Sequence, residues 1–233
     1  MDLARVETLE ASEILQWALE AYGDSFAIAT SFQKESTVLI DLASRVTPHV
    51  RAFTLDTGRL PEETYRMMDT VRERYGIPIE VVFPDREEVE RMATEYGPNL
   101  FLDSVERRKM CCEVRKVRPL ERKLKELRAW ATGLRREQAE TRTHIPKAGV
   151  VDGRMKISPL ADWTAAQLDE YIRVHQVPVH PLYARGYTSI GCGPCTRAIR
   201  AGEPQRAGRW WWEQEGGKEC GIHFATDGTV RHA

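Results

Sequence analysis

Short apolar runs alternate with amphipathic stretches over the first 160 residues of the chain. The runs at 26–30, 50–55, 79–83 and 129–134 have the length and composition of buried strands. Apolar positions at helical spacing predict helices over 8–22, 37–45, 61–75, 87–96, 115–128 and 162–175. Pro61 suits the first turn of its helix, and Asp162 is the expected N-cap of the last one. The alternation predicts an α/β fold, with a mostly parallel sheet and helices on both faces.

The pattern changes at about Ala201. The segment 201–233 is rich in glycine, contains three consecutive tryptophans, and shows no amphipathic period. We therefore predict a core domain over 1–200 and a C-terminal tail over 201–233 that docks on the core or moves.

Polar loops follow the first two predicted strands, where ligands bind in parallel α/β sheets. SFQKES (Ser31–Ser36) joins a strand to a helix, so backbone N–H groups and the helix dipole can face an anion. In the second loop Asp56 can accept a hydrogen bond from a ribose hydroxyl, and Gly58 permits close backbone approach. Either loop alone can be an ordinary βα connection; together they favour a nucleotide site.

Composition narrows the class of protein. The chain has 233 residues, 42% hydrophobic and 30% charged, with a formal net charge of −1, as in a globular protein without a global field for nucleic acid or membrane. We see neither a signal peptide nor an apolar run long enough to span a membrane, and we expect a cytoplasmic protein. Thiols stay reduced there, so its five cysteines point to metal or redox chemistry.

The cysteines divide into two pairs and a single residue. The pairs are Cys111–Cys112 and Cys192–Cys195. Four thiolates suit zinc or an iron–sulfur cluster, and adjacent cysteines favour the bulkier cluster. Structural zinc, an independent redox Cys-x-x-Cys motif, and simple burial of the first pair remain alternatives. The basic stretch 106–128 around the first pair is mostly a solvated helix face, with a few cations available for anions.

The fifth cysteine, Cys220, has no second cysteine nearby, which makes it a candidate nucleophile. A thiol reacts as thiolate, and His223, Arg206 and Arg209 could lower its pKa once the tail folds over a site. An exposed tail cysteine without function is the alternative.

The ordered motifs SFQKES, LDTGRLPEETY, CCEVRKVRPL, GLRREQAETR, SIGCGPCT, EPQRAGRWWWE and KECGIH resemble the assimilatory sulfonucleotide reductases over nearly the whole chain. The resemblance implies an adenine-nucleotide alpha-hydrolase-like fold, related to ATP pyrophosphatases. Those relatives carry SGGxDS where this chain has SFQKES, so we expect no ATP cleavage. Both cysteine pairs are typical of the thioredoxin-dependent branch that binds [4Fe–4S] and prefers adenylyl sulfate (APS).

The resemblance also assigns residues. One [4Fe–4S] cluster per chain would be held by Cys111, Cys112, Cys192 and Cys195, with Lys116 between the cluster and the substrate sulfate. The nucleotide would contact Ser31, Phe32, Gln33, Lys34, Ser36, Leu55, Asp56, Thr57, Gly58, Arg59 and the loop from Arg135 to Arg142. Arg206, Arg209 and His223 would complete the anion site when the tail closes.

The implied reaction begins with attack of the Cys220 thiolate on the sulfate sulfur, with AMP as leaving group. The resulting S-sulfocysteine is then reduced by thioredoxin, or by a glutaredoxin, with release of sulfite. The alternatives are a reductase of the 3′-phosphorylated substrate (PAPS), a tRNA-thiolating enzyme, and a zinc-stabilised nucleotide-binding module without catalysis. A homo-oligomer is compatible with the sequence.

Overall fold

A six-stranded sheet forms the centre of the molecule, in the order β3–β2–β1–β4–β6–β5. The computed structural model describes residues 2–139 and 142–213. The strands are β1 (Phe26–Ala29), β2 (Ala52–Leu55), β3 (Ile79–Val82), β4 (Ala129–Ala131), β5 (Ala148–Val151) and β6 (Arg154–Ile157). All neighbours are parallel except β5 and β6. The predicted mostly parallel sheet is confirmed.

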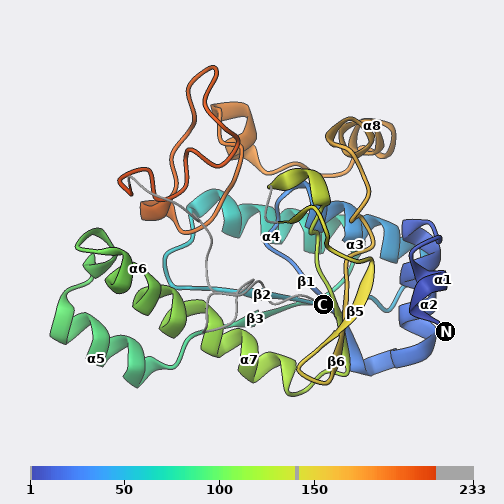
Figure 1. Ribbon diagram of the computed structural model, residues 1–233, viewed down its shortest axis with the longest axis horizontal. Helices are drawn as coiled ribbons and strands as arrows, with labels where there is room; N and C mark the ends of the chain where they lie inside the picture. Colours follow the sequence, from blue (N-terminus) through green and yellow to red (C-terminus); the bar gives the residue numbers. More distant parts are fainter. Residues whose placement is uncertain (1, 140–141, 214–233) are drawn as a thin grey trace.

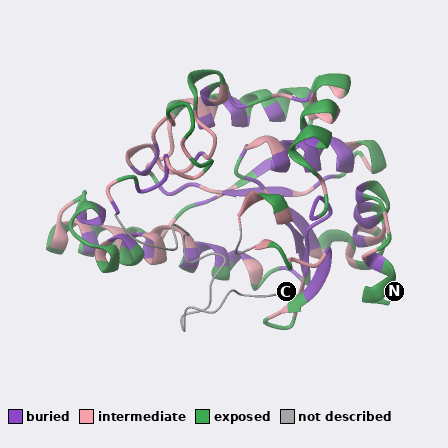
Figure 2. Cartoon of the chain, turned by 45° about the horizontal axis from the view of Figure 1, so that its top comes forward, coloured by how far each residue is buried: buried purple, intermediate pink, exposed green. Residues whose placement is uncertain are grey.

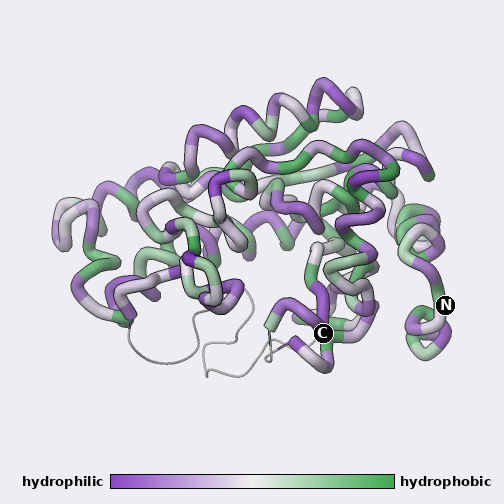
Figure 3. The backbone as a smooth tube through the Cα atoms, turned by 90° about the horizontal axis from the view of Figure 1, so that it is seen from above, coloured by the Kyte–Doolittle hydropathy of each residue, from purple (hydrophilic) through white to green (hydrophobic). Residues whose placement is uncertain are grey.

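Helices cover both faces of this sheet. They are α1 (Leu3–Val6), α2 (Ala11–Tyr22), α3 (Lys34–Val46), α4 (Glu62–Tyr75), α5 (Arg86–Tyr96), α6 (Val105–Cys112), α7 (Arg118–Leu124) and α8 (Ala165–His175). Figure 1 shows α3, α4 and α8 on one side of the sheet and α5, α6 and α7 on the other. The outer helices alternate between hydrophilic and hydrophobic positions (Figure 3), as expected of helices with one face against a sheet.

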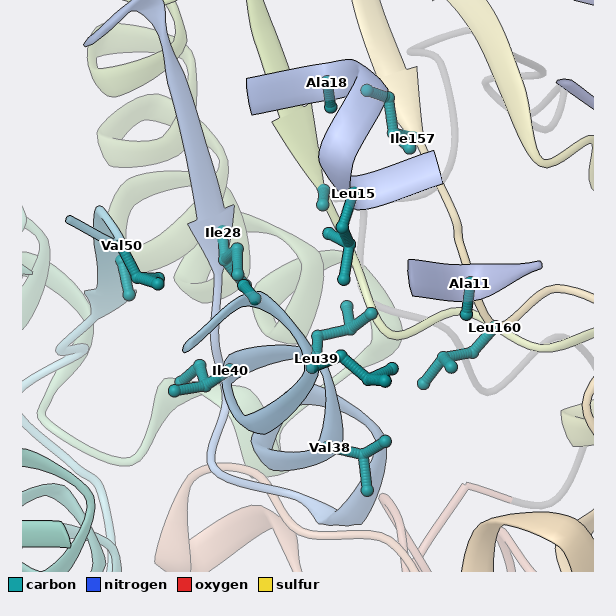
Figure 4. Close-up of a cluster of buried hydrophobic side chains, with 14 of the residues drawn as sticks. Ala11, Leu15, Ala18, Ile28, Val38, Leu39, Ile40, Val50, Ile157 and Leu160 are labelled. Carbon is teal, nitrogen blue, oxygen red and sulfur yellow. The ribbon is translucent and has the colours of Figure 1, made fainter. Parts of the chain in front are cut away.

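The largest core cluster lies between the sheet and the helices α2 and α3. Leu15 of α2, Ile28 of β1 and Leu39 of α3 are fully buried and lie close together in it (Figure 4). A second cluster on the opposite face packs Leu120 against Phe53 and Trp130. Figure 2 shows the same division, with buried positions concentrated on the strands and on the inward faces of the helices.

The predicted first residues of three helices, α3, α4 and α8, differ from the structure. Helix α3 begins at Lys34, three residues before the predicted start, so Ser36 is helical. Pro61 is the N-cap of α4 and precedes its first turn. Helix α8 begins at Ala165, because the Thr164 side chain accepts the Gln167 N–H in a capping box. Asp162, the predicted cap, instead forms an ion pair with Lys147 at 2.7 Å.

Two further features differ from the sequence pattern. The predicted helix 115–128 is part of a longer helical run, in which a π-helical segment (Glu113–Val117) separates α6 from α7. The β5–β6 hairpin was not predicted. No helix among the described residues has the length and apolar character that crossing a membrane requires.

Candidate functional site

A cavity of about 280 Å³ opens at the carboxyl ends of β1, β2 and β4. Its walls include Ser31, Gln33 and Ser36 after β1, Leu55 at the end of β2, and Gly133 after β4. Six cations also line it: Lys116, Arg142, Arg154, Lys156, Arg206 and Arg209. The described part of the chain therefore brings together the strand ends and most of the cations that the sequence assigned to an anionic nucleotide.

The β1–α3 loop is held by its own hydroxyl groups. Ser36 Oγ donates to the Gln33 carbonyl at 3.0 Å and accepts the Ser31 N–H at 3.3 Å. Phe32 adopts a left-handed φ of 56° and its side chain is fully buried, so it anchors the loop from below and does not line the cavity. This loop leads into the N-terminus of the 13-residue helix α3, whose dipole favours an anion there.

The loops after β1 and β4 touch at Gly133. A Cβ atom at this position would lie 2.7 Å from Glu35 Cβ and 3.0 Å from the backbone of Glu35 and Ser36. Only glycine allows the two loops to approach this closely. The contact fixes one corner of the cavity.

Two predicted nucleotide contacts are engaged elsewhere. Lys34 forms an ion pair with Asp169 at 2.7 Å and lies over the Tyr183 ring. The buried Arg135 pairs with Glu35 at 3.2 Å and with Glu137 at 3.1 Å. Neither cation lines the cavity. Arg142 does line it, and its Nη1 donates to Gln138 Oε1 at 2.6 Å.

The β2–α4 loop is organised from within by Asp56. This buried carboxylate accepts from the Gly58 N–H at 2.7 Å and from the Tyr65 hydroxyl at 3.1 Å. Burial, together with the hydrogen bond and the charge of Asp56, raises the pKa of Tyr65 to about 12. Gly58 has a left-handed φ of 69°, which permits the turn. Leu55 and Leu60, at the two ends of this loop, line the large cavity, whereas Asp56 stabilises the loop.

A second, smaller cavity is lined by all four cysteines of the two pairs. Cys111 and Cys112 end helix α6 directly before the π-helical segment. Cys192 caps the turn Gly193–Cys195, and Cys195 ends it. None of these four described cysteines forms a disulfide. The remaining walls carry Arg59, Phe101, Arg108, Arg115, Lys116 and Pro194. Sulfur atoms far apart in the sequence thus share one cation-rich pocket.

The thiols in this pocket differ in their acidity. Burial raises the pKa of Cys111, and burial followed by the neighbouring Cys192 raises that of Cys195 to about 12. Burial also acts to raise the pKa of Cys192, but the charge of Lys116 and the hydroxyl of Thr57 oppose it, and the net pKa lies below its ordinary value. Cys192 is thus the sulfur that the surrounding cations and hydroxyl favour as thiolate.

The two cavities share one wall. Lys116, in the π-helical segment, lines both of them. Its neighbour Arg115 donates to the Thr57 carbonyl at 2.7 Å, and Thr57 Oγ1 lies 3.2 Å from Cys192 Sγ. Arg59, predicted as a nucleotide contact, instead lines the cysteine pocket and stacks on Phe101.

Four thiols and several buried N–H donors surround the cysteine pocket. Among the described residues no group of three or more Cys, His, Asp or Glu is arranged to hold one metal ion. Three buried N–H groups in or beside the pocket, Arg115 Nε, Arg209 Nε and Trp210 Nε1, have no hydrogen-bond partner in the described part of the chain. A sulfide-rich anionic cluster offers acceptors of the kind these donors need, and four thiolates are its usual ligands.

Residues after Ala201 line the large cavity and pack beside the cysteine pocket. Arg209 lines the large cavity and stacks on the buried Trp210 ring, and Gly191 leaves the space that its guanidinium occupies. The Trp210 N–H donates to the Cys195 carbonyl at 3.2 Å. Cys220 and His223 lie outside the described residues, so their predicted roles stay predictions.

The sequence reasoning did not single out Arg108, Arg115, Trp210 or Glu213 as individual site residues. Arg115 lies three residues after Cys112 and next to Lys116, so its position in the sequence could have identified it as a site residue. Arg108 pairs with Glu213, which lies 105 positions away in the sequence, and no local sequence pattern predicts this contact.

The fold and the two cavities define an adenine-nucleotide alpha-hydrolase-like α/β protein with a cysteine-lined pocket beside a cation-lined cavity. The chain belongs to the phosphoadenosine phosphosulfate reductase domain family, whose profile matches residues 25–198. It is 49% identical over 226 residues to an adenosine 5'-phosphosulfate reductase of Burkholderia cepacia, covering 96% of this chain and 89% of the relative.

Two other comparisons agree with this membership. An adenosine 5'-phosphosulfate reductase of Allochromatium vinosum is 48% identical over 202 residues, which cover 86% of this chain and 79% of that protein. The crystal structure of a phosphoadenylyl-sulfate reductase from Candida auris in a phosphate complex superposes with a TM-score of 0.71 at 28% identity. That match covers 84% of this chain and 94% of the other.

Proposed function

We propose that this protein reduces adenosine 5'-phosphosulfate to sulfite and AMP in sulfate assimilation. The observation that carries the proposal is Lys116, which lines both the large cavity and the cysteine pocket. The relatives at 48–49% identity that are named adenosine 5'-phosphosulfate reductases support the same substrate.

In this proposal the large cavity holds the nucleotide. The α3 N-terminus and the backbone around Ser31 and Gln33 receive its phosphate, because N–H donors and the helix dipole favour an anion there. The sulfate lies toward Lys116 and Arg209, whose charges stabilise it in a partly desolvated site. Arg142 and Arg206 add charge on the same cavity wall.

The four pocket cysteines are proposed to hold one [4Fe–4S] cluster. Cys111, Cys112, Cys192 and Cys195 supply the thiolates that such a cluster needs. When bound, the cluster supplies a fixed negative charge next to Lys116 and ties the two cysteine segments together. The electrons for sulfite formation come from thiols.

The chemistry is assigned to Cys220. Its thiolate attacks the sulfate sulfur, an S–S bond forms, the bond between sulfur and the phosphate oxygen breaks, and AMP leaves. One thiol of thioredoxin then attacks the Cys220 sulfur and releases sulfite, and its second thiol resolves the mixed disulfide. Thioredoxin is thereby oxidised by two electrons. A glutaredoxin is an alternative electron donor. We expect the reaction to take place in the cytoplasm, and a homo-oligomer is compatible with the proposal.

Mass spectrometry of the full chain after mixing with APS alone tests this proposal. Without a thiol donor, the wild type should gain the mass of one SO₃ group on the peptide containing Cys220. The Cys220→Ser variant should gain none, yet keep its iron and its AMP affinity. Sulfite formation by that variant at a substantial rate would overturn the assignment.

The metal content tests the cluster separately. A brown protein with about four irons per chain is expected, whereas one zinc in a colourless protein would favour the binding-module alternative. Cys111→Ser should lose the iron and part of its stability, since metal binding couples to folding.

A further inference from the structure

Arg108 and Glu213 form a buried ion pair beside the cysteine pocket. Arg108 Nε donates to Glu213 Oε1 at 2.8 Å, and Nη2 donates to Oε2 at 3.1 Å. The two side chains are only 2% and 4% exposed. Bidentate geometry of this kind is directional as well as attractive, so the pair sets the relative position of the two segments that carry it.

Each partner of this pair is tied to a different cysteine segment. Arg108 lies one helical turn before Cys112 on α6, lines the same pocket, and hydrogen bonds to the Cys112 side chain. Glu213 donates its N–H to the Trp210 carbonyl at 3.0 Å, and Trp210 in turn donates to the Cys195 carbonyl. A continuous chain of contacts therefore links Cys112 to Cys195.

The Trp210 ring contacts both Arg108 and the cysteines. It is 1% exposed, packs in one apolar cluster with Cys111 and Cys195, and lies under the Arg108 guanidinium at 4.5 Å. The cation–π contact and the carboxylate fork together leave Arg108 little rotational freedom.

We propose that Arg108 is a positioning residue of the cysteine pocket, which orients the Cys112 sulfur and, through Glu213, holds the Cys192–Cys195 segment against α6 before any cluster is bound. The inference concerns the cysteine pocket that the proposed function uses, and it can be measured without turnover.

The experiment is alkylation of the iron-free, reduced full chain with iodoacetamide. The rate at each cysteine is followed by peptide mass spectrometry over a pH series and expressed per thiolate, because a change of charge beside a thiol also changes its thiolate fraction. In Glu213→Gln and Arg108→Gln we expect Cys112 and Cys195 to react at least several-fold faster than in the wild type. Lys109→Gln, an exposed cation on the same helix, is the matched control and should react like the wild type. Unchanged rates at both cysteines in folded Glu213→Gln would overturn the inference.

The double variant R108E/E213R distinguishes orientation of the Cys112 sulfur from stabilisation of the fold by the ion pair alone. It also serves if the single variants fail to fold. It restores attraction between the segments but places a carboxylate beside Cys112. We expect Cys195 to regain its protection while Cys112 stays fast. Full protection of both would mean that the pair only braces the fold, and would contradict the orienting role of Arg108.

The rate of iron release from the iron-containing protein gives a second test of the proposal. After transfer to a strong chelator, Glu213→Gln should lose iron several-fold faster than Lys109→Gln. If the protein holds no iron, the proposed cluster is wrong, yet the alkylation rates still decide the role of Arg108.

Discussion

Thr57 Oγ1 lies 3.2 Å from Cys192 Sγ, although 135 residues separate the two in the sequence. The same hydroxyl accepts the Arg59 N–H at 3.2 Å. One side chain thus connects the loop after β2, at the nucleotide end of the sheet, with the Cys192–Cys195 segment.

Thr57→Val should weaken this junction. It removes the hydrogen bond to Cys192 and leaves the Arg59 N–H without its acceptor, which costs about 1–3 kcal/mol for a buried group. Urea unfolding should show that loss, and iron should leave the loaded variant faster. Thr57→Ser keeps the hydroxyl and should behave like the wild type; equal stability of the Val and Ser variants would argue against the junction.

Lys116→Gln should separate sulfate recognition from nucleotide binding. A charged hydrogen bond contributes roughly 1.5–3 kcal/mol, so kcat/KM for APS should fall about 10- to 100-fold. AMP lacks the sulfate, and its Kd by calorimetry should change little. Lys125→Gln, an exposed lysine at the C-cap of α7, is the control. A parallel loss of AMP affinity would place Lys116 at the phosphate instead.

Gly133→Ala should force the two loops at the cavity corner apart. The added methyl group meets Glu35 Cβ at 2.7 Å and the backbone of Glu35 and Ser36 at 3.0 Å. Overpacking of this kind costs about 1–3 kcal/mol and should also weaken AMP binding. Gly193→Ala meets nothing closer than the Arg59 carbonyl at 3.7 Å, so AMP should bind it normally. Normal AMP binding by Gly133→Ala would contradict this account of the cavity.

His180 should make the fold sensitive to mild acid. Its Nδ1 accepts the Leu182 N–H at 3.3 Å and its Nε2 lies 3.0 Å from Thr64 Oγ1, so the neutral ring fits its surroundings. Burial lowers the pKa of His180 below 6.5, only partly opposed by the charge of Glu63. Below pH 6.5 the unfolded chain takes up a proton that the folded ring resists.

Stability contributed by neutral His180 is therefore present above pH 6.5 and is lost as the pH falls through the folded pKa. The slope is at most about 1.4 kcal/mol per pH unit. Urea midpoints between pH 7.5 and 5.5 should fall less steeply in His180→Asn than in the wild type. His49→Asn, at an exposed position, should keep the wild-type slope; a wild-type slope in His180→Asn would rule out this origin.

The strands and the order of the loops were predictable because each apolar run ends at a polar motif. The β5–β6 hairpin was also readable. Asp152 and Gly153 stand between apolar-rich runs, and both adopt positive φ, 49° and 75°, as a tight hairpin turn of the Asp-Gly type requires. The capping box of Thr164 with Gln167 was a second overlooked local signal.

Other features depend on contacts between distant residues. Lys34 and Arg135 looked like anion ligands, but Asp169 and Glu35 engage them, and these pairings arise only when α3 meets α8 and the loop after β4. The Arg108–Glu213 ion pair likewise exists only in the folded chain, and so does the position of Lys116 between the two cavities. A sequence pattern names such residues as candidates, and the fold decides what they contact.

The central claim is tested most directly by steady-state sulfite formation with reduced thioredoxin, measured in parallel on APS and PAPS with the same iron-loaded preparation. The account predicts a higher kcat/KM for APS, with sulfite and AMP formed in equal amounts. A higher kcat/KM for PAPS would assign the protein to the 3′-phosphorylated substrate, and no sulfite from either nucleotide would contradict the proposed reaction.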